Sequence, residues 1–264
     1  MRFPDFLTAA TRGAMVAAAV GAGLALTTLG ASAANEFSAA QKSGIETIIH
    51  DYLLANPEVV RDAIEELEKR QKFAEATSRE KTINDQTDKL FNSANQSVVG
   101  NPHGDVTLVE FFDYNCGYCK QSLAVVAKLI ESDPKLRVVL KDFAILGTDS
   151  TEVAQIATAA RQQLSPEKFW EFHRKLLSTR GHIGKAQALA AAKEVGADTD
   201  RLEKDAAKPE TQAALKEVAT LADQLHFDGT PAWVVGKEAL VGGVNYSTLK
   251  GKIDNLHKCG KTSC

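Results

Sequence analysis

The sequence predicts an α/β domain that carries an inserted helical subdomain and is preceded by an α-helical segment. Three observations predict this arrangement. An apolar run at 106–113 leads into an amphipathic helical pattern, a second apolar run follows at 136–143, and two short runs within 232–241 come only after a long helical stretch. Short apolar runs bounded by turn residues are typical of buried strands, and spacings of three and four residues are typical of helices.

The first 33 residues have the pattern of an export signal. Arg2 and Arg12 make the start basic, residues 14–29 are apolar and small, and Ala31-Ser32-Ala33 fits a small-x-small cleavage site. We expect cleavage after Ala33, the alternative being an uncleaved membrane anchor. An exported chain matures where disulfides persist.

The charge of the mature chain is close to neutral. Removing residues 1–33 leaves 29 basic and 33 acidic residues, a net charge of −4. A small negative net charge gives no reason to expect binding to nucleic acid or to an anionic membrane. The four cysteines are too few for a disulfide-stapled mini-protein, and the length is ample for an ordinary hydrophobic core.

Residues 34–70 predict two amphipathic helices that cannot bury their apolar stripes alone. They meet at Asn56-Pro57, where Asn is a favoured N-cap and Pro fits the first helical turn. Their apolar residues are Ile45, Ile48, Ile49, Tyr52 and Leu53, then Val59, Val60, Ala63, Ile64 and Leu67. The partner is either the main domain or further copies of the segment. Residues 71–96 are mainly charged and polar, which we read as a helical linker, although composition does not exclude a flexible arm.

The main domain is expected over residues 97–258. Its elements in order are an edge strand near 98–99, the strand 106–113, a helix after Cys119, the strand 136–143, a helical insertion over about 148–226, strands at 232–235 and 239–241, and a helix at 246–256. This order predicts a thioredoxin-like fold with a helical insertion. A short tail at 259–264 follows, with a cysteine at each end.

Cys116-Gly117-Tyr118-Cys119 stands where the main strand gives way to a helix. A C-x-x-C pair is half of a zinc site, a structural disulfide or a redox pair. A zinc site needs a second close pair of ligands, and the sequence offers none, so we expect no metal site. Unpaired N–H groups and the dipole at a helix N-terminus stabilise a thiolate, which favours the redox pair.

The position of each thiol predicts its role. Cys116, at the helix start, is expected to be the exposed nucleophile, and Cys119, one turn further, the buried resolving thiol. Gly117 would permit a tight turn into the helix. No separate cofactor is expected, because the cysteine pair itself forms the redox-active disulfide.

Three further features have both an ordinary and a functional interpretation. Glu110 could lie at an exposed edge; if it is buried, a raised pKa would let it accept the proton of Cys119. Thr230-Pro231 could be an ordinary turn; in a thioredoxin-like fold this position holds a cis-proline that faces the redox pair and leaves the backbone of residue 230 free to bind substrate. Cys259 and Cys264 predict a structural disulfide worth roughly 2 kcal/mol, the alternatives being a second redox relay or a metal clip.

The run Glu110 to Cys119, the helical insertion and Thr230-Pro231 together resemble the DsbA-like family of periplasmic thiol–disulfide oxidoreductases. Residues 45–67 resemble the N-terminal oligomerisation segment of its ScsC-like branch. The resemblance implies a periplasmic homo-oligomer, dimer or trimer, that acts on unfolded or misoxidised exported proteins. It also implies a membrane thiol reductase or oxidase as redox partner.

Gly117-Tyr118 departs from the oxidase members, which carry Pro-His there. Tyr118 cannot supply the positive charge of a histidine, and Gly-Tyr with Thr before the proline is similar to periplasmic disulfide isomerases. This implies a couple nearer about −180 than −120 mV and favours a disulfide isomerase or reductase. A dithiol oxidase, a copper(I)-binding or metal-delivery protein and a non-catalytic chaperone remain alternatives.

Overall fold

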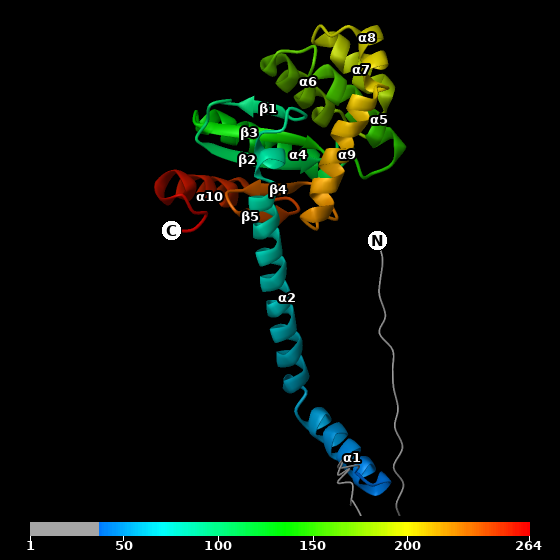
Figure 1. Ribbon diagram of the computed structural model, residues 1–264, viewed down its shortest axis with the longest axis vertical. Coiled ribbons are helices and arrows are strands. Elements are labelled where there is room, and N and C mark those ends of the chain that lie inside the picture. The colour runs from blue at the N-terminus through cyan, green and yellow to red at the C-terminus, as the bar shows by residue number, and fades with distance from the viewer. Residues whose placement is uncertain (1–36) are drawn as a thin grey trace, which may run out of the picture. The chain divides into compact units, whose positions relative to one another are not determined.

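The computed structural model describes residues 37–264 (Figure 1). The expected export signal and its cleavage after Ala33 lie outside the described residues. The chain divides into two units, one ending at Val60 and one spanning Arg61 to Cys264, and each is described by itself. None of the helices within residues 37–264 combines the length and apolar character needed to cross a bilayer.

The first unit contains helix α1, Ala39–Ala55, which displays its apolar residues to solvent. Ser38 caps the helix through a capping box with Gln41, and Asn56 ends it with its backbone and side-chain N–H groups 2.9 Å from the Tyr52 carbonyl oxygen. No residue of α1 is buried; Ile48 is 69% exposed. The stripe expected from the sequence is therefore present and uncovered within the described residues.

Helix α2, Glu58–Asp85, runs without a break through the second predicted helix and into the predicted linker at 71–96, as far as Asp85. Charged side chains one turn apart stabilise it, as between Glu66 and Arg70, whose Oε1 and Nε lie 2.8 Å apart. The sequence is compatible with either a helix or a flexible arm in the linker, and the structure shows a helix as far as Asp85. Its last turns reach the main domain, where Ile83 is buried, and the short helix α3, Thr87–Phe91, follows.

A five-stranded mixed sheet organises the second unit, in the order β1-β3-β2-β4-β5. Its strands are β1 (Ser97–Gly100), β2 (Val106–Phe112), β3 (Leu136–Asp142), β4 (Ala232–Val235) and β5 (Glu238–Val241). Only β2 and β3 run parallel. The sequence prediction of a thioredoxin-like fold with a helical insertion and an N-terminal helical segment is confirmed.

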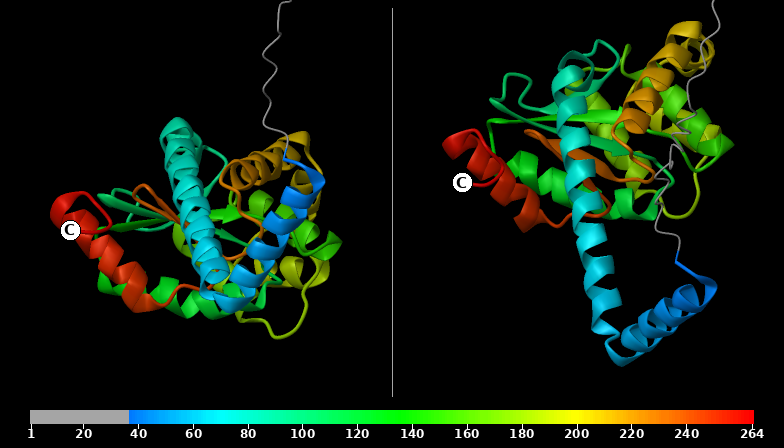
Figure 2. Two further views of the ribbon diagram at one scale, coloured as in Figure 1. Left: turned by 90° about the horizontal axis from the view of Figure 1, so that it is seen from below. Right: turned by 60° about the horizontal axis from the view of Figure 1, so that its bottom comes forward.

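Helices cover both faces of the sheet (Figure 2). The helices that pack against strands include α4 (Gly117–Ser132), α6 (Pro166–Ser178), α9 (Pro209–Gln224) and α10 (Tyr246–Cys259), and the insertion adds α5 (Thr148–Ala160), α7 (Lys185–Glu194) and α8 (Thr199–Ala206), which pack on one another. Leu108 and Phe112 of β2 share a core with α4 and α10, whereas Val109 and Phe111 share the other core with α9 and Ile83. Because side chains alternate along a strand, Glu110 lies on the face of β2 that α4 covers.

Candidate active site

The Cys116-Gly117-Tyr118-Cys119 motif begins α4 directly after the central strand of the sheet. Cys116 is the N-cap residue, and its carbonyl oxygen accepts from the N–H of Lys120 at 3.0 Å. Cys119 lies in the first helical turn and is fully buried. Both cysteines are free thiols. The structure therefore places the pair at the strand-to-helix junction, with the open N–H groups of the helix start beside Cys116.

Cys116 is less exposed than expected. Only 7% of it is accessible, whereas Tyr118, two residues further, is 65% exposed. The cause is the loop before β4: the Cys116 thiol donates to the carbonyl oxygen of Thr230, with Sγ and O 3.1 Å apart. The prediction of an exposed nucleophile is wrong: Cys116 is buried, and its sulfur contacts a segment distant in sequence.

The covering loop contains the proline that the sequence analysis singled out. The peptide bond between Thr230 and Pro231 is cis. Pro231 is buried and Thr230 half-buried, and the Pro231 carbonyl oxygen accepts from the N–H of Gly242 at 2.8 Å. The structure thus brings Thr230, Pro231 and Cys116 together.

Glu110 is buried beneath the motif, which excludes the exposed-edge interpretation. It is 1% exposed, and its Oε1 has no hydrogen-bond partner. Burial, with a smaller contribution from Cys116, raises the pKa of Glu110 to about 8. Burial and then the charge of Glu110 also raise the pKa of Cys119 well above its usual value. Burial therefore favours the protonated form of both groups, and a negative charge on Glu110 would disfavour the Cys119 thiolate further.

The two residues between the cysteines face solvent. Tyr118 borders a pocket of about 300 Å³ whose lining is uncharged and includes Gln121, Val125 and Val244. Gly117 has ordinary helical backbone, and nothing lies within 4 Å of the position that a Cβ would take. Glycine is therefore not required there by sterics.

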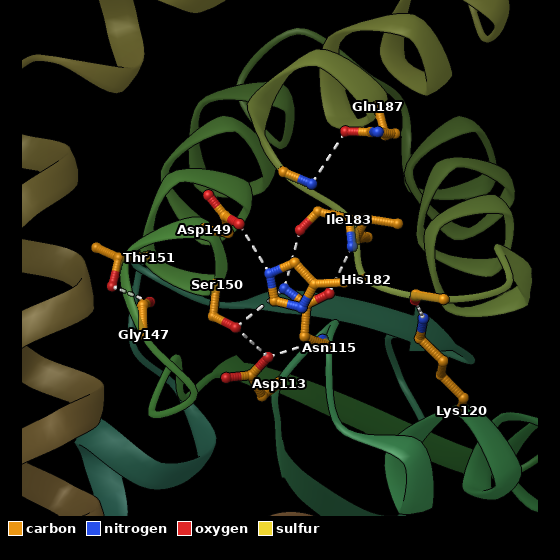
Figure 3. Close-up of polar contacts among 12 residues, drawn as sticks. Asp113, Asn115, Lys120, Gly147, Asp149, Ser150, Thr151, His182, Ile183 and Gln187 are labelled. Atoms are coloured by element: carbon orange, nitrogen blue, oxygen red, sulfur yellow. Dashed lines mark hydrogen bonds and ion pairs between the residues drawn. The ribbon is translucent and has the colours of Figure 1, made fainter.

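Two polar residues just before the motif, Asp113 and Asn115, hold a network that the sequence analysis missed (Figure 3). The Asp113 carboxylate accepts from the N–H groups of Asn115, Ile145 and Leu146 and from the Ser150 hydroxyl, all within 2.8–3.0 Å. The Asn115 amide bonds both backbone groups of Ile183. Asp and Asn between a strand and a helix start are typical of local caps, but nothing in the sequence indicated the distant partners.

The chain ends in a disulfide. Cys259 and Cys264 are joined with an S–S distance of 2.06 Å, and both residues are exposed. Among residues 37–264, no group of three or more His, Cys, Asp or Glu side chains is placed to hold a metal ion.

Comparisons with known proteins identify the family. The profile of the DSBA-like thioredoxin domain matches residues 107–254, more than half of the chain. The chain belongs to this family. Residues 41–74 match a second profile, the copper resistance protein ScsC N-terminal domain. Membership in the DSBA-like family makes the protein a relative of thiol–disulfide oxidoreductases, as the motif and the cis-proline loop had suggested.

Solved structures of similar proteins cover most of the described chain. A thioredoxin-like oxidoreductase from Silicibacter pomeroyi is 42% identical, with a TM-score of 0.62, over 65% of this chain and 98% of that one. A linker-deletion variant of ScsC from Proteus mirabilis is 25% identical, with a TM-score of 0.64, over 84% of this chain and 97% of that one.

Curated relatives match somewhat more than half of the chain. The thiol:disulfide interchange protein DsbA of Bordetella pertussis is 26% identical over 58% of this chain and 76% of its own length. The Na(+)/H(+) antiporter NhaA 1 of Salinispora arenicola is 29% identical over 59% of this chain. The match spans 24% of the length of that antiporter.

Proposed function

We propose that the protein is a periplasmic disulfide isomerase or reductase that acts on unfolded or misoxidised exported proteins and uses only its redox-active cysteine pair. The observation that carries this proposal is that the proline loop, the cysteine pair and a buried carboxyl lie next to one another. The Thr230–Pro231 loop lies against Cys116, and burial, followed by the buried Glu110 beneath the motif, raises the pKa of Cys119.

In the first step, Cys116 attacks a wrong disulfide of the substrate. A bond forms between the Cys116 sulfur and one substrate sulfur, and the other substrate sulfur leaves as a thiolate. The reacting form of Cys116 is the thiolate, so the bond from its thiol to the Thr230 carbonyl must be given up. An extended substrate segment pairing with the backbone at residue 230 would hold the scissile disulfide in line.

The mixed disulfide then has two exits. In isomerisation, a second substrate thiolate attacks its bond to Cys116, which releases Cys116 as a thiolate and leaves a different substrate disulfide. In reduction, Glu110 in its ionised form takes the proton of Cys119. The Cys119 sulfur then attacks the Cys116 sulfur, the bond from Cys116 to the substrate sulfur breaks, and that substrate sulfur leaves as a thiolate. The second exit oxidises the cysteine pair, so a membrane thiol reductase would have to restore it.

The surroundings of Tyr118 favour isomerase or reductase over oxidase. Tyr118 and the pocket beside it offer no charged side chain, so the motif itself supplies no cation to stabilise a Cys116 thiolate. Without that stabilisation the reduced form is favoured less, and the disulfide is a weaker oxidant. A dithiol oxidase would need a strongly stabilised Cys116 thiolate, which makes its disulfide a strong oxidant.

The test measures the reduction potential of the cysteine pair and the activity on a substrate with scrambled disulfides. We expect a reduction potential nearer about −180 than −120 mV, measured by equilibrating the protein with glutathione buffers. We also expect the reduced protein to convert a substrate with scrambled disulfides to its native form. A potential near the oxidising end, with fast oxidation of a reduced substrate and no activity on the scrambled one, would establish the oxidase instead.

Self-association through α1 belongs to the same proposal. The exposed stripe of α1, together with the match of residues 41–74 to an ScsC N-terminal domain, supports a dimer or trimer joined by residues 34–70. Several active sites would then face one substrate.

We expect Ile48→Lys with Tyr52→Lys to reduce the solution mass to that of one chain. Both side chains are more than half exposed, at 69% and 55%, and a lysine pair would make their burial between copies unfavourable. Light scattering measures the mass, and isomerisation is expected to fall several-fold while the reduction potential stays unchanged. Ser43→Lys with Thr47→Lys adds the same charge to polar positions of α1 and is the matched control. A wild-type protein of monomer mass would contradict the oligomer.

A further inference from the structure

We propose that Asn115 is a positioning residue for the disulfide exchange: it ties the peptide preceding Cys116 to the loop 179–184 of the helical insertion and thereby fixes the reacting sulfur. The inference rests on the proposed function and deepens it. Without a substrate reaction at Cys116, this tie would be a structural staple and nothing more.

The Asn115 amide bonds the loop in the way that one strand bonds another. Its Oδ1 accepts from the N–H of Ile183 at 2.8 Å, and its Nδ2 donates to the carbonyl oxygen of the same residue at 2.9 Å (Figure 3). Nδ2 also donates to the Ser150 hydroxyl at 3.1 Å, which in turn donates to Asp113. A planar amide presents an acceptor and a donor side by side, as this pairing with one backbone residue requires.

A second tie reaches the same loop from the other side of the motif. Lys120 follows Cys119 directly, and its Nζ donates to the carbonyl oxygens of Thr179 and Gly181 at 2.8 and 2.6 Å. The residues immediately before and after the four-residue motif therefore both bind loop 179–184. This loop lies between α6 and α7 of the insertion. The insertion is therefore hydrogen-bonded to both residues that flank the cysteine motif.

The tie determines the geometry of Cys116 because the two residues share a peptide group. Asn115 is held at its backbone N–H by Asp113 and at its side chain by Ile183 and Ser150. This leaves little freedom to the Cys116 backbone, which has φ −75° and ψ 121° as the N-cap. The sulfur is thereby kept between the open helix N-terminus and Thr230. Displacement of a reacting atom by a fraction of an ångström slows a reaction even where binding is intact.

The experiment compares Asn115→Ala with Gln187→Ala. Asn115→Ala removes all three amide bonds. Gln187→Ala removes the 3.0 Å bond from the N–H of Gly184 to Gln187 Oε1, which holds the other end of the same loop without reaching the motif. The readout is the rate at which the reduced protein forms a mixed disulfide with a small aromatic disulfide, which needs no docking surface. Denaturant unfolding reports the stability of each variant.

We expect Asn115→Ala to slow mixed-disulfide formation about tenfold. Gln187→Ala is expected to be less stable than the wild type but to form the mixed disulfide at the wild-type rate. Lys120→Met removes the second tie and is expected to slow the reaction several-fold, which keeps the inference testable if Asn115→Ala does not fold. A wild-type rate in a folded Asn115→Ala protein, or equal slowing by Gln187→Ala, would overturn the positioning role and leave the proposed function standing. A wild-type protein that forms no mixed disulfide would overturn both.

Discussion

Cys116→Ala is expected to abolish disulfide exchange, and Cys119→Ala to block only the release of the mixed disulfide by the second cysteine. Cys116 is the member of the pair that contacts the cis-proline loop and retains some exposure, whereas Cys119 is fully buried. Without Cys116 no mixed disulfide forms. Without Cys119 the mixed disulfide forms but only a second substrate thiol can release it. Mass spectrometry of the protein incubated with a disulfide substrate distinguishes the variants, since only Cys119→Ala should accumulate the covalent adduct.

The C-terminal pair provides the matched control for this experiment. Replacing Cys259 and Cys264 together with Ser removes two cysteines as well, but from an exposed tail at the end of α10. We expect the exchange rate to stay at the wild-type value and the stability to fall by roughly 2 kcal/mol, as loop entropy predicts for a short closed loop. If this variant lost activity as fully as Cys116→Ala, the tail would be a second redox centre.

The parts of this protein that the sequence predicted are those whose determinants are local. The apolar strand, the motif at its end and the amphipathic α4 follow one another within 27 residues, from Val106 to Ser132. Their periodicity and the N-cap position of Cys116 are visible without knowledge of anything else. The proline loop was predictable for a different reason, because the order of elements gives its place opposite the motif.

The features that escaped prediction depend on contacts between distant segments. Cys116 is mostly buried because residue 230 folds against it, 114 positions away, and no local pattern reports such cover. Asn115 bonds Ile183 across 68 positions. The continuity of α2 was open for another reason, since charged residues one turn apart stabilise a helix but are equally compatible with a solvated arm.

Glu110→Gln is expected to slow resolution by Cys119 about 100-fold, the low end of the range for a lost proton acceptor. Glutamine has nearly the same shape but cannot take a proton, and Cys119 is too deeply buried for water to replace it. Attack by Cys116 should change little, so mixed disulfide accumulates and its decay gives the resolving rate in a quenched-flow experiment. Unchanged decay would remove Glu110 from the mechanism.

Asp142→Asn is the matched control for that experiment. Asp142 lies in the neighbouring strand opposite Phe112, and burial raises its pKa to about 7. It is thus a second carboxyl whose pKa desolvation raises, but it does not contribute to the raised pKa of Cys119. We expect Asp142→Asn to resolve mixed disulfides at the wild-type rate. If Glu110→Gln and Asp142→Asn slowed resolution equally, the cause would be a general effect of altered core charge and not proton transfer.

The pH dependence of stability shows independently whether Glu110 is protonated in the folded protein. With a pKa of about 8 when folded and 4.5 when unfolded, Glu110 binds more proton in the folded state between these values. The free energy of unfolding therefore falls as pH rises through this window, by at most about 1.4 kcal/mol per pH unit from this group. Glu110→Gln removes that slope and leaves the contribution of Asp142 in place, so the stability of the variant relative to wild type should rise from pH 4.5 and level off near 8. A difference that stays constant with pH would mean that Glu110 titrates as an ordinary carboxyl in the folded protein, without the raised pKa that makes it a strong proton acceptor for Cys119.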